Sequence, residues 1–183
     1  MLILASGSPR RAKILRDLGL QFMVVKTDAE ETNHPSDPEG TVTGNALRKL
    51  AACEKRNGEV LAADTIVWLD GKIYGKPVDL EEARAFLREL SGKTHKVYTG
   101  VAYWDGKATR TGVGVSEVTF KTLTETEIAE YVEKVKPTDR AGAYDIDDYG
   151  PLIIDHFEGE YENIMGLPVE VLRELGIGIH EKP

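Results

Sequence analysis

Short apolar segments alternate along the chain with polar and turn-forming residues. Leu2–Ala5 is a continuous apolar run, which is typical of a buried strand. A helix is expected directly after it, because Ser8 can cap the N-terminus, Pro9 fits the first turn and Gly19 can end the helix. Similar runs predict further strands at Phe22–Val25, Val60–Leu69, Lys72–Tyr74, Val97–Trp104, Ala108–Phe120 and Leu152–Asp155.

Apolar residues at helical spacing predict further helices, which begin near Val42, Asp79, Thr124 and Pro168. Asp79 and Thr124 are each followed three residues later by a glutamate, which is the spacing of a capping box. Asp-Gly turns at 70–71 and 105–106 join neighbouring strands into hairpins. Because these hairpins interrupt the alternation of strands and helices, the pattern predicts an α/β fold in which helices flank a mixed sheet.

Length, charge and cysteine content narrow the class of protein. A chain of 183 residues fits a single domain, which we expect to cover residues 1–183. It contains no apolar run of about 18 residues, so no membrane-spanning helix is expected. The net charge of −8 argues against a broad surface for nucleic acid or for a membrane. The single cysteine and the lack of a secretory signal favour a cytoplasmic location.

The segment Ser6–Arg11 is the first candidate site. It leads from the first strand into the first helix, and a helix N-terminus presents free N–H groups and partial positive charge to an anion. The hydroxyl groups of Ser6 and Ser8 can add hydrogen bonds, and Arg10 and Arg11 offer bidentate contacts to phosphate. The alternative is a solvated helix face. We expect both arginines to be exposed and to serve a ligand more than the fold.

Two acidic residues are candidates for metal or proton chemistry. Asp64 lies inside the apolar run Val60–Leu69, where an unpaired carboxylate is costly to bury. It either faces solvent or is held there for chemistry. Glu31 follows a predicted strand, and a carboxylate in that position suits Mg²⁺, which also bridges substrate phosphates. The alternative for Glu31 is a plain solvated loop.

Lys49 and Lys76 are single lysines, a type that is commonly found on the surface. Lys76 is the more suggestive of the two, because Gly75 and Pro77 restrict the backbone on either side of it. The residues at 91–94, Ser-Gly-Lys-Thr, end like a phosphate-binding P-loop. Leu87 stands where the first glycine of that motif must be, which argues against a P-loop kinase.

Taken together, these residues resemble the Maf family, and the resemblance covers essentially the whole chain. The motifs that match in order are Ser6–Arg11, Glu31, Lys49, Ala63–Thr65, Gly75–Pro77, Ser91–Lys93, Thr99–Val101, Ala141–Tyr144 and Gly166–Pro168. Maf proteins are nucleoside triphosphate pyrophosphatases that are related in fold to inosine triphosphate pyrophosphatases. The resemblance therefore implies an elongated mixed sheet flanked by helices, two lobes around a central cleft and a divalent metal cofactor (Mg, Mn or Co). A homodimer is left open.

The resemblance also implies roles for individual residues. Asp64 is expected to be the proton acceptor, and Glu31 and Asp64 are expected to hold the metal. Ser8, Arg11, Lys49 and Lys76 are expected to contact the phosphates. The expected reaction is attack of water on the α-phosphate of a nucleoside triphosphate, which releases the monophosphate and pyrophosphate. The alternative of another class is a nucleotide-binding regulator of septum formation that no longer turns over.

Two positions resemble one branch of the family. Arg10 after Ser-Pro and Thr65 after Asp64 are similar to the branch that acts on dTTP and UTP, so both are expected to be substrate contacts. That branch usually has glutamine at the position of Asp147. An ionised aspartate only accepts hydrogen bonds, so a base contact from Asp147 implies a preference shifted toward CTP or guanine nucleotides. The alternative is that Asp147 faces solvent.

Overall fold

The computed structural model describes residues 1–54 and 57–179; residues 55–56 and 180–183 of the expected domain lie outside the described part. The strands are β1 (Leu2–Leu4), β2 (Phe22–Val24), β3 (Glu59–Leu69), β4 (Lys72–Tyr74), β5 (Thr94–Trp104), β6 (Thr109–Phe120) and β7 (Ile154–Glu158). The α-helices are α1 (Pro9–Asp17), α2 (Pro38–Ala52), α3 (Leu80–Leu90), α4 (Glu125–Val135), α5 (Tyr161–Met165) and α6 (Val169–Glu174). Two short 3₁₀ helices are η1 (Ala141–Ala143) and η2 (Gly150–Leu152).

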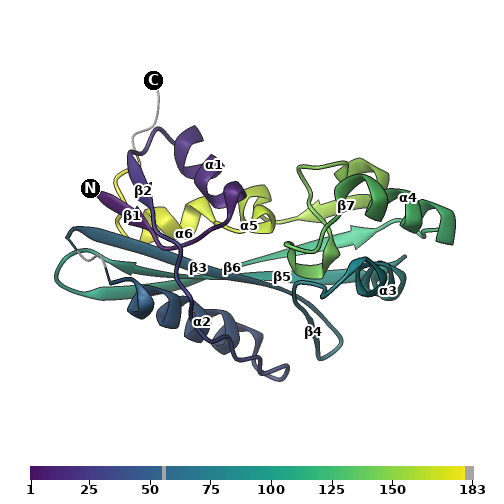
Figure 1. Ribbon diagram of the computed structural model, residues 1–183, viewed down its shortest axis with the longest axis horizontal. Helices are drawn as coiled ribbons and strands as arrows, with labels where there is room; N and C mark the ends of the chain where they lie inside the picture. Colours follow the sequence, from purple (N-terminus) through teal and green to yellow (C-terminus); the bar gives the residue numbers. More distant parts are fainter. Residues whose placement is uncertain (55–56, 180–183) are drawn as a thin grey trace.

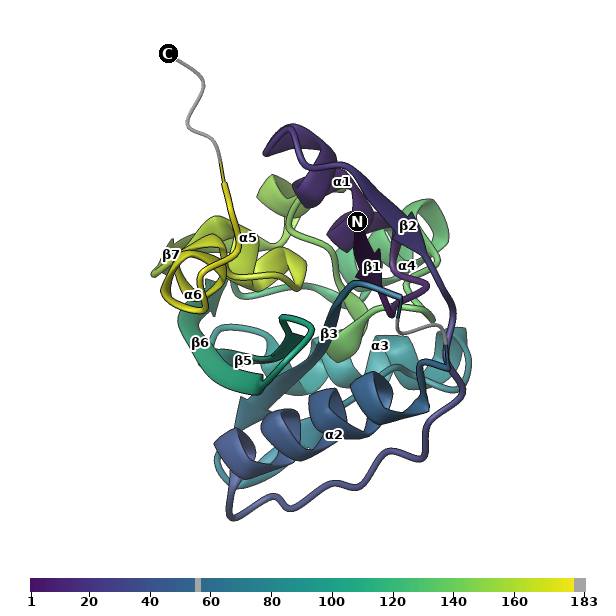
Figure 2. The ribbon, with the colours of Figure 1, turned by 90° about the vertical axis from the view of Figure 1, so that its left-hand side faces the viewer.

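In the described part of the chain, the strands form one seven-stranded sheet in the order β2-β1-β3-β5-β6-β7, and β4 pairs with β3. β1 runs parallel to β2 and β3, and the other strand pairs are antiparallel. The helix α2 covers one face, and α1, α5 and α6 lie on the other (Figures 1 and 2). The predicted mixed sheet with flanking helices is therefore confirmed.

Three long strands, β3, β5 and β6, run along the length of the molecule (Figure 1). Around one end of them lie β1, β2, α1 and α6, and around the other end lie β4, α3 and α4 (Figure 1). The two groups share the central strands and form two lobes of one elongated body. The chain also passes from one lobe to the other between β7, at the edge of the sheet, and α5 (Figure 1).

The outer edge of β3 is paired at its two ends and open in the middle. β1 pairs with its first residues, up to Leu61, and β4 pairs with Val67–Leu69. β1 is short because the chain leaves the sheet at Ser6 to form the loop before α1. Between these two pairings, among the described residues, Ala62–Ile66 have a strand partner only in β5. Asp64 and Thr65 lie in this gap.

One face of β3 packs against α2. Ala46, Leu50 and Cys53 of that helix form an apolar cluster with Val60 and Ala62 of β3. These helix residues have the spacing that predicted a buried stripe. Because side chains alternate along a strand, the carboxylate of Asp64 is on the same face as Ala62 and points toward α2.

Local signals in the sequence are largely confirmed, and the differences have physical reasons. α2 begins at Pro38, earlier than the predicted Val42, because Asp37 caps it and Pro38 fits its first turn. β7 begins at Ile154 and not at Leu152, because Gly150–Leu152 form a 3₁₀ turn. The five-residue helix α5 was not predicted, since its apolar stripe is too short to stand out. None of the described helices has the length and apolar character needed to cross a membrane.

Candidate active site

A cavity of about 470 Å³ lies where the edge of β3 is open. Its walls come from the loop into α1, the loop after β2, the middle of β3, residues 75–76, residues 139–144 and residues 164–166. Residues from both lobes therefore line it. The predicted site residues that line it are Ser8, Arg10, Arg11, Glu31, Lys49, Asp64, Thr65 and Lys76. Segments far apart in the sequence thus converge on one cavity.

Asp64 is almost fully buried, with 5% of its surface exposed. Its Oδ1 accepts a hydrogen bond from Lys49 Nζ at 2.9 Å, and its Oδ2 accepts one from Asn45 Nδ2 at 3.0 Å. Both donors stand on α2, four residues apart and therefore on one face of the helix. The buried carboxylate is thus paired with one cation and one amide. Of the two interpretations that the sequence allowed, a carboxylate that faces solvent is excluded.

Glu31 joins Asp64 through Lys49. The Lys49 ammonium lies 2.9 Å from Oε1 of Glu31 and 2.9 Å from Oδ1 of Asp64. Burial alone would raise the pKa of Glu31, but the hydrogen bond and charge of Lys49, together with the charges of Lys76 and Arg11, hold that pKa below its usual value. Glu31 is therefore ionised at neutral pH. The carboxylates of Glu31 and Asp64 thus both face the ammonium group of Lys49.

These two carboxylates fit a divalent cation. The ammonium group of Lys49 lies between them, so the two carboxylates are close enough to share one cation. Hard cations such as Mg²⁺ take carboxylate oxygens as ligands. Among the described residues, no group of three or more His, Cys, Asp or Glu side chains is placed to hold a metal ion. Mg²⁺ is commonly held by one or two carboxylates together with substrate phosphates, and Glu31 and Asp64 match that arrangement.

Arg11 is buried, contrary to the exposed position expected from the sequence. Its Nε donates to the Gly166 carbonyl at 2.7 Å, one terminal nitrogen donates to Ser6 Oγ at 3.1 Å and the other to Thr65 Oγ1 at 3.0 Å. Burial lowers the pKa of Arg11 to about 10, so the side chain keeps its charge at neutral pH. The helix turns this arginine inward, where it ties α1 to β3 and to the end of α5.

The hydrogen bonds of Arg11 leave capacity for an anion. All three acceptors are neutral oxygens, so they orient the guanidinium without cancelling its charge. The described residues use three of its five N–H donors. A buried cation that lines a cavity and still has donors is a strong position for binding phosphate oxygens.

Ser8 is the N-cap of α1, as predicted: its Oγ accepts a hydrogen bond from the Arg11 backbone N–H at 3.4 Å. Ser6 Oγ accepts from the Ser8 N–H at 3.2 Å and from Arg11. The first turn of α1 therefore lies at the cavity wall with its cap formed. Gly7 passes close to Lys26, and a Cβ at Gly7 would lie 3.3 Å from the Lys26 Cε.

A second charged cluster, around Asp145, includes two arginines that line the cavity. Arg140 Nε donates to the buried Asp145 carboxylate at 3.0 Å, and one terminal nitrogen of Arg10 lies 4.0 Å from the same carboxylate. Burial lowers the pKa of Arg10, although the charge of Asp145 opposes this. Arg10 and Arg140 both line the cavity, so Asp145 holds two arginines in its wall.

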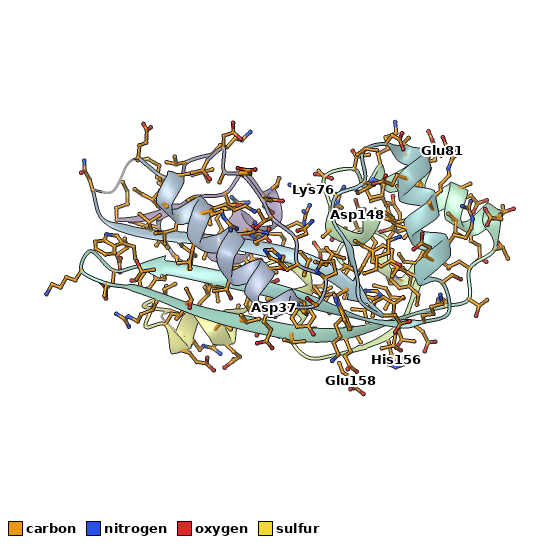
Figure 3. All side chains as sticks on the ribbon, turned by 90° about the horizontal axis from the view of Figure 1, so that it is seen from below. Asp37, Lys76, Glu81, Asp148, His156 and Glu158 are labelled. Atoms are coloured by element: carbon orange, nitrogen blue, oxygen red, sulfur yellow. The ribbon has the colours of Figure 1, made fainter. Side chains whose placement is uncertain are left out.

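Two remaining predictions have different outcomes. Lys76 lines the cavity, and Figure 3 shows it between the two lobes. Asp147 is exposed and is not among the residues that line the cavity. Its Oδ1 accepts a hydrogen bond from the hydroxyl group of Tyr161 at 2.8 Å, and its N–H donates to Asp145. The structure therefore brings together every predicted site residue except Asp147.

Sequence reasoning missed three residues of this site: Asn45, Arg140 and Asp145. Asn45 could have been found, because it lies one helical turn before Lys49 and so shares its face. Arg140 directly precedes the Ala141–Tyr144 motif, which was a local signal. Asp145 directly follows the same motif, but its partners Arg10 and Arg140 are identified only by the fold.

Comparison with known proteins gives a consistent result. The family model described as "Maf-like protein" matches residues 1–176. A "dTTP/UTP pyrophosphatase" from Desulfitobacterium hafniense is 45% identical over 184 residues, which cover 95% of this chain and 83% of the relative. One from Bacillus cytotoxicus is 45% identical and covers 94% and 93%, and one from Thermotoga maritima is 44% identical and covers 92% and 84%.

Proposed function

The chain belongs to the Maf family, and from this premise we propose that it hydrolyses nucleoside triphosphates to the monophosphate and pyrophosphate, with dTTP and UTP as its substrates. One observation carries the proposal: two carboxylates and the cations Arg11, Lys49 and Lys76 line one cavity. A triphosphate needs positive charge around it, and its hydrolysis needs an oriented water and a base.

The cations bind the triphosphate. Arg11 is held in a fixed orientation by three neutral acceptors and offers its remaining N–H groups to phosphate oxygens. The N-terminus of α1, capped by Ser8, adds its partial positive charge at the same wall. Lys49 and Lys76 add the positive charge of their ammonium groups. Together they place the α-phosphate near the carboxylates.

Asp64 is the proton acceptor. Because Asn45 and Lys49 hold its two oxygens, the carboxylate has a fixed orientation beside the cavity. A water molecule attacks the α-phosphorus, Asp64 takes its proton, and pyrophosphate leaves with the electrons of the broken P–O bond. Glu31 and Asp64 would hold a divalent cation, which when bound would supply positive charge that offsets the charge of the triphosphate.

The position of Asp147 removes the argument for a shifted base preference. The argument for a shifted preference toward CTP or guanine nucleotides depends on a base contact from this residue. Its carboxylate is instead exposed and bound to Tyr161. The names of the relatives, dTTP/UTP pyrophosphatase, therefore remain the best guide to the base.

A nucleotide panel tests this function. Purified protein is mixed with dTTP, UTP, CTP or GTP and Mg²⁺, and pyrophosphate and monophosphate are measured. We expect equal amounts of both products, fastest release from dTTP and UTP, and loss of release in excess EDTA. Nucleotide binding without any product would favour the non-catalytic regulator. Release of inorganic phosphate in place of pyrophosphate would show a different reaction.

A further inference from the structure

Asn45 makes hydrogen bonds beyond the one that holds Asp64. The side chain is 1% exposed and stands on α2 beside the buried carboxylate of Asp64. Its Nδ2 donates to Asp64 Oδ2 at 3.0 Å and to the Thr32 carbonyl at 3.1 Å. Its Oδ1 accepts from the Thr32 N–H at 2.9 Å and from Arg48 at 2.9 Å. The amide thus uses both donors and accepts two hydrogen bonds.

These hydrogen bonds connect Asp64 with the segment that carries Glu31, the other carboxylate proposed to hold the metal. Thr32 directly follows Glu31, so the paired bonds to its N–H and carbonyl fix the backbone from which Glu31 extends. The same amide nitrogen fixes Oδ2 of Asp64, which leaves Oδ1 toward Lys49. The loop of residues 26–37 runs along α2 before entering it (Figure 2), so the amide joins the loop, the helix and β3 at one point.

We propose that Asn45 is a positioning residue for the hydrolytic reaction, which sets the orientation of Asp64 and the placement of Glu31 relative to it. The inference rests on the proposed function. Only a group that both donates and accepts can satisfy the Thr32 N–H, the Thr32 carbonyl and a carboxylate together. Leucine offers neither, and aspartate would set an acceptor against Asp64. Loss of a group that holds a metal-binding or catalytic side chain typically lowers metal affinity or the reaction rate 10–100-fold.

Thr41 provides a matched control on the same helix. It is also 1% exposed, and its hydroxyl group accepts from the His34 N–H at 2.9 Å and bonds to the His34 and Asp37 carbonyls. It therefore anchors the 26–37 loop as Asn45 does. In contrast to Asn45, in the described part of the chain its hydroxyl group bonds to His34 and Asp37 and not to Asp64. Thr41→Val weakens the loop anchor without touching the carboxylates.

The experiment compares wild type, Asn45→Leu and Thr41→Val in three measurements: kcat and KM for dTTP, the Kd for Mn²⁺ without nucleotide by electron paramagnetic resonance, and the melting temperature. For Asn45→Leu we expect kcat to fall about 10–100-fold and the Kd for Mn²⁺ to rise about tenfold or more. KM should change little, because the phosphate-binding cations remain. For Thr41→Val we expect a lower melting temperature with kcat and the Kd for Mn²⁺ near wild type.

Two results would overturn the inference: wild-type kcat and Mn²⁺ affinity in folded Asn45→Leu, or an equal loss of kcat in Thr41→Val. If Asn45→Leu does not fold, the nearly isosteric Asn45→Asp replaces it. A fall in kcat of tenfold or more at unchanged KM then supports positioning, and wild-type kcat refutes it. Failure of the proposed function looks different. Wild type would release no pyrophosphate, while weakened Mn²⁺ binding in Asn45→Leu would still show that the amide places the carboxylates.

Discussion

Arg11 carries a positive charge into the interior of the molecule, beside the cavity that Asp64 also lines. Three neutral oxygens hold its guanidinium, and each belongs to a different segment: the loop before α1, β3 and the end of α5. One side chain therefore joins these elements and presents positive charge to the cavity. We expect substitution of Arg11 to affect both stability and activity.

Arg11→Ala should lower both stability and activity. Loss of the guanidinium removes one donor each from the Gly166 carbonyl, Ser6 Oγ and Thr65 Oγ1. This loss should cost about 1–3 kcal/mol and lower the melting temperature by several degrees in a protein of this size. The kcat/KM for dTTP should fall as well. Arg11→Lys keeps the charge but loses the planar guanidinium. Its melting temperature and kcat/KM should lie between those of wild type and Arg11→Ala. A melting temperature equal to that of wild type in Arg11→Ala would show that the guanidinium does not hold the fold.

Asp147→Gln should leave base selectivity unchanged. The carboxylate is exposed, bonds to Tyr161 and does not line the cavity. Ratios of kcat/KM among dTTP, UTP, CTP and GTP are the measurement, in wild type and variant under the same conditions. A tenfold shift between any two nucleotides would mean that Asp147 reaches the base when substrate is bound.

At the scale of elements, α2 and the loop of residues 26–37 bring the carboxylates together. Asp64 comes from β3 and Glu31 from the loop, and Lys49 of α2 lies between them. Apolar spacing indicated the helix, and the place of Asp64 in an apolar run indicated that residue, because both are local signals. Glu31 and Lys49 were singled out by the family resemblance. The sequence could not indicate the open edge of β3, since that gap depends on where β1 and β4 pair with residues far along the chain.

Glu31→Gln should raise the Mg²⁺ concentration needed for half-maximal activity roughly tenfold or more, because one of two anionic ligands becomes neutral. Glu30→Gln is the matched control: Glu30 is the neighbouring residue in the same loop, is exposed and is not among the residues that line the cavity. Glu30→Gln should need the same Mg²⁺ concentration for half-maximal activity as wild type. Equal Mg²⁺ requirements in all three proteins would remove Glu31 from the metal site.

At the scale of the whole molecule, the long strands β3, β5 and β6 carry one sheet through both lobes (Figure 1). Buried groups on these strands meet residues that the sequence alone does not place near them. His95 of β5 is 1% exposed, and its Nε2 lies 2.7 Å from the hydroxyl group of Tyr144, which lines the cavity. Its ring also packs edge-on against Phe120 of β6. Such contacts follow from the tertiary fold, which local sequence signals do not specify.

His95 makes stability depend on pH. Burial lowers the pKa of His95 to about 3 from an ordinary value of 6.5. The unfolded chain therefore binds a proton below pH 6.5 that the folded protein does not, and stability falls with pH until about pH 3. Between pH 7 and pH 5 this residue should lower the free energy of unfolding by about 2 kcal/mol. Urea unfolding of wild type and His95→Phe at both pH values measures this change in the free energy of unfolding. An equal change in the two proteins would refute the role of His95.

The most direct measurement is pyrophosphate release from dTTP by wild type and Asp64→Asn at saturating nucleotide and Mg²⁺. The amide keeps the volume of the side chain but cannot take the proton from water. We predict that kcat falls about 10²–10⁴-fold, the loss typical of a missing general base. Melting curves and nucleotide binding must show that the variant is folded and still holds dTTP. A folded Asp64→Asn protein with the kcat of wild type would show that the buried carboxylate between Asn45 and Lys49 is not the base.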